Sequence, residues 1–167
     1  EHVYGDLNKK VKAIIKSKDC EIGLESTVLD VSVDPPIILR PGSISYEKLK
    51  QIIPQLKLSD GKQKHKAPGM KYKHYSPKAK IILFEKEAKE DIKDYEKKLL
   101  ERKKKVKIIV LKKSIKMSKE LFKLFREYDK EKIDSILILG TDEKGLGLAL
   151  MNRVRKASSK IISNNKK

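Results

Sequence analysis

The apolar and polar residues of this chain follow two different patterns, one before Pro77 and one after it. After Pro77, short apolar runs alternate with longer segments whose apolar residues recur every three or four positions, as on one face of a helix. Strands are predicted at 80–84, 106–111 and 133–139, and helices at 88–104, from a cap at Ser118 onward, and at 146–162. This order predicts a small parallel sheet with helices on its faces.

The part before Pro77 shows a weaker pattern. Residues 1–7 predict no regular element, and residues 8–16 are typical of a short amphipathic or strand-like piece. Further on, the pattern predicts a strand at 23–30 with Ser26, Val28 and Asp30 on one face, a buried strand at 37–39, and a helix from Tyr46 to Pro54 capped by Ser43 or Ser45. We expect residues 1–60 to form a partial sheet that lacks its native partners.

The segment that joins the two parts is Ala-Pro-Gly-Met-Lys-Tyr-Lys-His-Tyr-Ser-Pro at residues 67–77. Its two prolines favour a defined, mostly extended loop. Its lysines, tyrosines and histidine suit an anionic or nucleotide ligand. The same residues equally fit a solvated basic connector whose tyrosines fill a domain interface.

The composition narrows the class of protein. The 167 residues are 38% hydrophobic and 38% charged, so a core can form under a heavily charged surface. No apolar run is long enough to span a bilayer, and Cys20 stands alone, which excludes a disulfide framework and a cysteine metal site. The three histidines lack metal-ligand spacing. We expect a cytoplasmic protein with no membrane contact and no metal site of its own.

The net charge of +18 lies mostly in the second part of the chain. Residues 1–77 hold 14 Lys/Arg against 9 Asp/Glu, and residues 78–167 hold 27 against 14. Such a charge attracts nucleotides, nucleic acid or anionic surfaces. A lysine-rich background composition explains it equally well, because lysine and glutamate are mixed on the predicted helices. With three phenylalanines and no tryptophan, stacking on single strands is not favoured.

Two further features could bind an anion. Arg40 follows a predicted strand and precedes the turn Pro41-Gly42, where its guanidinium could grip a phosphate or carboxylate in two places, or could form a structural ion pair. The loop at 140–147 enters a helix N-terminus beyond a strand end, but its two acids and incomplete glycine pattern favour a structural turn over a phosphate loop.

Three motifs together resemble the threonylcarbamoyl-AMP synthase family, also called Sua5/YrdC/YwlC. They are Gly-Leu-Glu-Ser-Thr-Val-Leu-Asp at 23–30, Ile-Leu-Arg-Pro-Gly at 38–42, and the segment 67–77, in the family's order. The stretch at 145–153 is similar to the close of the longer, two-domain members. The resemblance therefore extends over the chain from end to end.

The resemblance implies an α/β fold in three pieces. Residues 1–60 would be the tail of a YrdC-like mixed α/β catalytic domain, 61–79 an interdomain linker loop, and 80–167 a Sua5-type accessory domain with a small Rossmann-like parallel sheet. The family's Lys-x-Arg element and its further serine and asparagine groups do not occur in these residues. We therefore expect a fragment that is inactive alone.

The resemblance also implies an activity, that of a nucleotidyltransferase. Family members convert L-threonine, bicarbonate and ATP to threonylcarbamoyl-AMP and pyrophosphate, which serves the t6A modification of tRNA. It implies that Ser26 contacts threonine, with Thr27 as a reserve candidate, that Arg40 contacts the ATP phosphates, and that Tyr75 and, less directly, His74 reach the nucleotide. ATP is a substrate that carries Mg²⁺ with it. No residue is identified as a general base.

Two other functions stay open. The lysine-rich surface fits a basic RNA-binding module without catalysis, for which steep salt dependence and indifference to nucleotide are expected. A stand-alone flavodoxin-like regulatory domain is the third alternative, although it leaves the three motifs before residue 78 unexplained.

Overall fold

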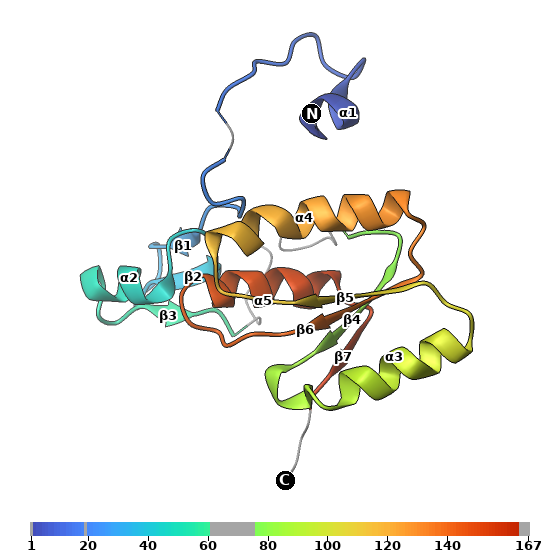
Figure 1. Ribbon diagram of the computed structural model, residues 1–167. Helices are drawn as coiled ribbons and strands as arrows, with labels where there is room; N and C mark the ends of the chain where they lie inside the picture. Colours follow the sequence, from blue (N-terminus) through green and yellow to red (C-terminus); the bar gives the residue numbers. More distant parts are fainter. Residues whose placement is uncertain (1, 19, 61–75, 164–167) are drawn as a thin grey trace.

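The structure, a computed structural model, describes residues 2–18, 20–60 and 76–163, and its largest unit is a four-stranded parallel sheet (Figure 1). The strands lie in the order β5-β6-β4-β7. Their bounds are β4 Lys80–Phe84, β5 Val106–Val110, β6 Ser135–Leu139 and β7 Lys160–Ile162. The helices between them are α3 Asp91–Glu101, α4 Ile115–Lys130 and α5 Leu146–Ala157, and a 3₁₀ turn at Lys86–Ala88 precedes α3.

Helices cover both faces of this sheet, so the α/β arrangement expected after Pro77 is confirmed (Figure 1). On β4, Ile81 and Leu83 belong to the core beneath α4 and α5, whereas Ile82 and Phe84 belong to the core beneath α3. All four side chains are buried. A strand buried on both faces needs a continuous apolar run, and this is why the sequence predicted β4 and β6 well.

The predicted helix at 146–162 was wrong in its last third. Helix α5 ends at Ala157, and Ser158 is extended at φ −71° and ψ 139°, with its hydroxyl donating to the carbonyl of Val154 at 2.7 Å. Residues 160–162 form β7, which pairs with β4. A short apolar run after a helix fits either a last helical turn or a strand, so periodicity alone could not separate the two.

Several other predicted ends differ from the structure. The N-cap of α4 is Ser114, whose side chain accepts from the Met117 N–H, whereas Ser118 is buried inside the helix. Helix α3 is shorter than the predicted 88–104, and Lys103 beyond it has a positive φ of 56°. Residues 1–7, for which no element was expected, contain α1 His2–Leu7.

A second, three-stranded sheet lies beside one end of α4 and α5, at the left of Figure 1. Its elements are β1 Val28–Asp30, β2 Ile37–Arg40, α2 Tyr46–Ile52 and β3 Lys57–Leu58. β1 and β2 pair antiparallel, and β3 adds to β2 in parallel. The strand predicted at 23–30 is thus limited to its last three residues.

The residues before β1 dock this small sheet on the parallel-sheet unit. Leu24 packs against the core beneath α4 and α5. Gly23 has a φ of +72°, and a Cβ there would lie 2.7 Å from the backbone Cα of Lys119. Only glycine allows this approach. The start of the motif at 23–30, which was predicted to be a strand, is therefore a close contact with α4.

Within the described residues, no helix is long and apolar enough to cross a membrane.

Candidate functional site

The antiparallel pairing of β1 with β2 brings Arg40 to Ser26. Val28 is the register partner of Arg40, which places the end of β2 beside the start of β1. The Arg40 guanidinium donates from Nε and Nη2 to the Ser26 carbonyl at 3.2 and 3.0 Å, and from Nη2 to the Ser26 Oγ at 3.2 Å. The Ser26 hydroxyl accepts in this contact, so its own proton can be donated to a ligand. Two predicted site residues therefore lie together, Ser26 exposed and Arg40 half-buried.

The turn after Arg40 holds the Ser26 backbone at very close range. A Cβ on Gly42 would lie 2.3 Å from the Glu25 carbonyl oxygen and 2.4 Å from both the Ser26 carbonyl carbon and the Thr27 nitrogen. The Ser43 N–H donates to the same Glu25 carbonyl at 3.2 Å. Glycine is required here because any side chain would overlap the facing backbone.

Thr27 has a structural role in this arrangement. Its Oγ1 donates to the Ile44 carbonyl at 2.6 Å and accepts from the Ile44 N–H at 3.1 Å. Both contacts fasten the turn after β2 to the start of β1. The neighbouring hydroxyl of Ser26 is the more exposed of the two, so Thr27 is the weaker candidate for a ligand contact.

Helix α5 adds two cations that the sequence-based site did not include. The Arg153 Nε lies 2.7 Å from Glu25 Oε2, an ion pair rather than an aligned hydrogen bond, and the Arg153 side chain is 9% exposed. Burial, followed by the positive charges of Arg153 and Arg40, lowers the pKa of Lys156. Lys156 therefore lies near both Arg153, which pairs with Glu25, and Arg40, which contacts Ser26, and the three cations form the cationic cluster of this site.

A sequence signal for these two residues was present. Arg153 closes the quoted stretch at 145–153, and Lys156 follows it by three positions, which places both on one face of a helix. What the pattern could not reveal is that this face meets the residues before β1. That contact depends on how the small sheet docks on α5.

A second contact joins the small sheet to the beginning of α5. Glu47, in the first turn of α2, accepts from the Gly145 N–H at 3.1 Å. Hydrogen bonds from its own backbone and from Gly145 lower the pKa of Glu47. Of the two predicted caps of α2, Ser43 and Ser45, the structure has Ser45, whose side chain accepts from the Lys48 N–H at 3.3 Å.

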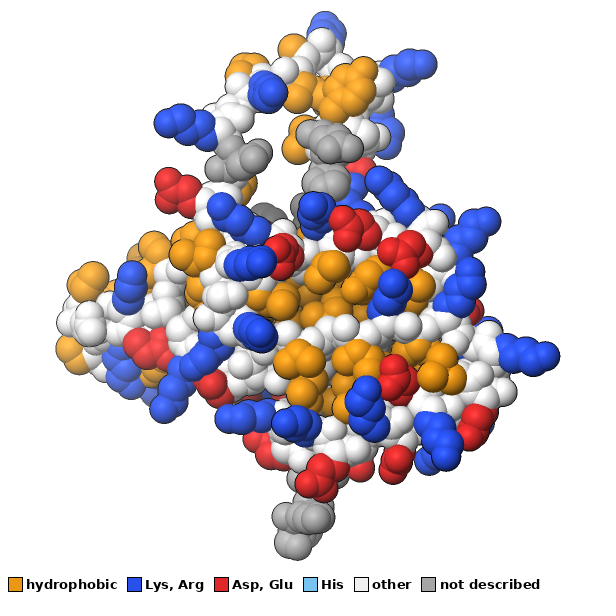
Figure 2. Space-filling view, viewed as in Figure 1, with side chains coloured by type: hydrophobic (Ala, Val, Ile, Leu, Met, Phe, Trp, Pro, Cys, Tyr) orange, Lys and Arg blue, Asp and Glu red, His pale blue; other side chains and the backbone are white. Residues whose placement is uncertain are grey.

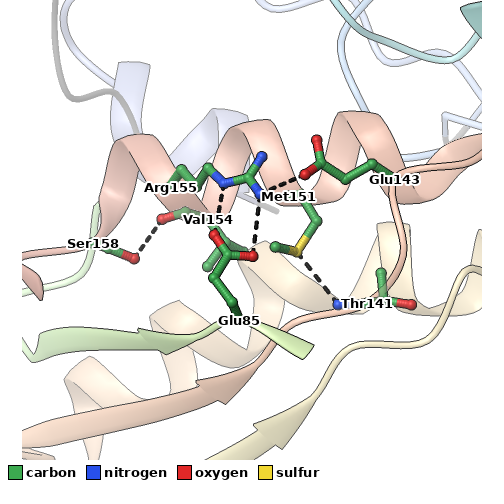
Figure 3. A network of polar contacts seen from close by, with 7 residues as sticks. All are labelled: Glu85, Thr141, Glu143, Met151, Val154, Arg155 and Ser158. Atoms are coloured by element: carbon green, nitrogen blue, oxygen red, sulfur yellow. Dashed lines mark hydrogen bonds and ion pairs between the residues drawn. The ribbon is translucent and has the colours of Figure 1, made fainter. Parts of the chain in front are cut away.

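The loop at 140–147 is held by ion pairs, which agrees with its interpretation as a structural turn. The loop follows β6, next to the end of β4, and the helices after these two strands cover opposite faces, which is the usual ligand position in such sheets. There Arg155 pairs with Glu85, the residue after β4, at 3.0 Å and with Glu143 of the loop (Figure 3). Asp142 pairs with Lys113 at 2.9 Å, and this contact lowers the Asp142 pKa.

An apolar pocket of about 530 Å³ lies between α4 and the residues before β1. Its apolar lining includes Leu24, Pro77, Phe122 and Phe125. The charged groups around it have partners: Glu25 pairs with Arg153, Arg126 with Asp6 at 2.7 Å, and Asp129 accepts from the Lys78 N–H at 2.8 Å. The pocket therefore offers mainly apolar contact.

Two predicted site residues, His74 and Tyr75, lie outside the described residues.

In the part of the chain that is described, no three His, Cys, Asp or Glu residues are grouped so that they could hold a metal ion. On the face drawn in Figure 2, Lys and Arg side chains are spread among Asp and Glu, and hydrophobic side chains gather in the middle.

Known proteins match this chain along most of its length. Residues 44–159 match the family model described as the C-terminal domain of threonylcarbamoyl-AMP synthase. The threonylcarbamoyl-AMP synthase of Pyrococcus abyssi is 38% identical over 177 residues, and that of Schizosaccharomyces pombe 35% over 198. These alignments cover 94% and 97% of this chain but 52% and 48% of the relatives. The chain therefore spans about half the length of the curated relatives it matches.

Solved structures agree with the sequence matches. The crystal structure of P. abyssi Sua5 complexed with L-threonine gives a TM-score of 0.85 at 35% identity, covering 97% of this chain and 54% of that one. A variant of the same protein, with a histidine and the next tyrosine replaced by alanine, gives 0.74 at 32%, covering 88% and 49%.

The fold is thus an α/β fold whose parallel-sheet domain matches the C-terminal domain of threonylcarbamoyl-AMP synthases. The chain belongs to the threonylcarbamoyl-AMP synthase (Sua5) family and corresponds to the C-terminal portion of its members.

Proposed function

We propose that these residues form part of an enzyme that makes threonylcarbamoyl-AMP from L-threonine, bicarbonate and ATP, with release of pyrophosphate. The observation that carries the proposal is the contact of Arg40 with the exposed Ser26, which joins a hydroxyl donor and a guanidinium. A hydroxyl suits the polar groups of an amino acid, and a guanidinium suits phosphate or carboxylate. Family membership supplies the reaction to which this pair is suited.

The chemistry makes positioning the main task. The threonine amine adds to bicarbonate with loss of water, and a carbamate oxygen then attacks the α-phosphorus of ATP as pyrophosphate leaves. Both reactants of that second step are anions, so cationic stabilisation and alignment matter more than a side-chain nucleophile. ATP enters as its Mg²⁺ complex, which shares in the charge neutralisation.

In this proposal each predicted residue keeps a separate role. Ser26 donates to threonine, and Arg40 stabilises the Ser26 backbone while facing the ATP phosphates. Tyr75 and His74 reach the nucleotide from the linker. The sequence contains one His-Tyr dipeptide, His74-Tyr75. The solved P. abyssi variant, in which a histidine and the next tyrosine are replaced by alanine, supports the choice of these two residues for the test by mutation.

The division of the chain follows the same proposal. Residues 1–60 act as part of a YrdC-like catalytic domain, 61–79 as the linker, and 80–167 as the accessory domain. The whole enzyme acts as a nucleotidyltransferase in the cytoplasm and serves the t6A modification of tRNA. The threonine complex of P. abyssi Sua5, similar over 97% of this chain, supports threonine as the amino-acid substrate.

The Ser26 role is tested by kinetics of the native polypeptide that contains these residues. Ser26→Ala removes one hydroxyl contact, worth about 1–2 kcal/mol, so the KM for threonine rises about tenfold while the KM for ATP stays within twofold. Ser43→Ala is the matched control, because Ser43 contacts Glu25 only through its backbone N–H among the contacts described. Equal threonine KM values in both variants and the wild type would remove Ser26 from the site.

The net charge of +18 favours a second candidate, an RNA-binding module without catalysis. The mixture of both charge signs in Figure 2 and the surface ion pairs of the helices weaken it, since a nucleic-acid site gathers one sign of charge. RNA affinity that falls steeply with salt and ignores ATP would favour this candidate. Nucleotide-selective binding would favour the enzyme.

A further inference from the structure

Two arginines of α5 form ion pairs with different parts of the molecule. Arg155 pairs with Glu85 and Glu143 inside the parallel-sheet unit (Figure 3). Arg153, two residues earlier, reaches across to Glu25 in front of β1. The two residues share a helix and a chemistry, but only Arg153 connects α5 to the segment that contains Ser26.

Arg153 is the more buried of the two arginines. Its side chain is 9% exposed, against 33% for Arg155, while the partners Glu25 and Glu85 are 29% and 18% exposed. The ion pair holds Glu25 firmly, because the loss of Glu25 would leave the buried Arg153 charge poorly solvated. The side chain of Glu25 is therefore held at a defined place on α5.

Fixing Glu25 determines where the next residue can lie. The Glu25 carbonyl accepts from the Ser43 N–H, so its backbone is held as well as its side chain. Ser26 is the next residue, and Arg40 contacts both its carbonyl and its hydroxyl. A Glu25 that stays bound to α5 therefore keeps the Ser26 backbone and hydroxyl in place beside Arg40.

We propose that Arg153 is a positioning residue for threonine: through Glu25, helix α5 of the C-terminal domain fixes the Ser26 hydroxyl in the direction that threonine requires. This inference rests on the proposed role of Ser26 in the enzyme. It gives the accessory domain a specific task in substrate binding, and it assigns that task to one ion pair between the two sheets.

The first experiment uses the native polypeptide that contains this chain, with the variants Arg153→Met, Arg153→Lys and Glu25→Gln. Arg153→Met and Glu25→Gln each raise the KM for threonine about tenfold or more, with the KM for ATP within twofold, and Arg153→Lys recovers part of the loss. Arg155→Met is the matched control: it removes an ion-paired arginine of the same helix and lowers Tm, yet leaves the threonine KM unchanged. KM values for threonine and ATP that rise together in the Arg153 variants would overturn the proposal.

A second measurement separates this inference from the proposed function. Hydrogen exchange on the 167-residue chain should show faster amides at 25–28 in Arg153→Met and Glu25→Gln than in Arg155→Met. Unchanged exchange at 25–28 overturns the positioning role whatever the enzyme does. A different result would be faster exchange at 25–28 in these variants, with a wild-type polypeptide whose ATP turnover does not depend on threonine. This result would support the contact of Arg153 with Glu25 as the support of residues 25–28, and it would reject the proposed function.

Discussion

Replacing Gly42 with alanine should disturb the backbone that holds Ser26. The added Cβ would lie 2.3 Å from the Glu25 carbonyl oxygen and 2.4 Å from atoms of Ser26 and Thr27. Ordinary contact needs about 3.5 Å, so the turn has to move by roughly 1 Å. That movement breaks the 3.2 Å hydrogen bond from the Ser43 N–H to Glu25. Overpacking costs about 1–3 kcal/mol and the lost hydrogen bond about 1, for a total of about 2–4 kcal/mol.

Urea unfolding followed by circular dichroism measures the free energy, and Tm should fall by at least about 4 °C. Hydrogen exchange should locate the loss at 25–30 and 37–44. Gly5→Ala is the control, because nothing lies within 4 Å of a Cβ there and alanine is favoured in the helix α1. A Gly42→Ala chain with wild-type Tm and unchanged exchange at 25–30 would refute the close backbone approach.

Three further predictions follow from the same contacts. Arg155→Met lowers the free energy of unfolding at pH 7 by about 1–3 kcal/mol. Arg155 holds the pKa of Glu143 below its usual 4.5. The stability from this pair is therefore fully present above pH 4.5 and is lost as pH falls below it, through the lowered pKa. Urea unfolding measured from neutral pH down to about pH 3 should show a weaker pH dependence in the variant. Thr27→Val loses two hydrogen bonds to the facing turn and about 1–2 kcal/mol, which Thr27→Ser restores in urea unfolding. In the native polypeptide, Tyr75→Ala and His74→Ala raise the KM for ATP about tenfold, a loss of about 1–3 kcal/mol, and that for threonine less; unchanged ATP kinetics would make this stretch a connector.

The sequence predicted those parts of the fold that local pattern determines. The apolar runs at 80–84 and 133–139 are buried on both faces and bounded by charged or glycine residues, so β4 and the bulk of β6 were found. The split between α5 and β7 was missed because Ile161 and Ile162 continue the apolar spacing of the helix, while their pairing with β4 comes from distant residues.

The candidate site shows the same division. Ser26 and Arg40 were proposed together from motifs at two predicted strands, and antiparallel pairing brings them into contact. Arg153 was quoted as part of a motif but given no role, because its contact with Glu25 depends on how two sheets dock. A pattern of helical spacing shows which face a residue occupies and not which distant segment meets that face.

Pyrophosphate release that depends on both threonine and bicarbonate tests the central claim most directly. The native polypeptide containing these residues should release pyrophosphate from ATP only when both are present. The 167-residue chain by itself should not, because one hydroxyl and one guanidinium, those of Ser26 and Arg40, cannot align three reactants alone. ATP turnover by the native polypeptide that is indifferent to threonine would contradict the proposed reaction, and threonine-dependent turnover by the 167 residues alone would show that the catalytic groups lie elsewhere in this chain.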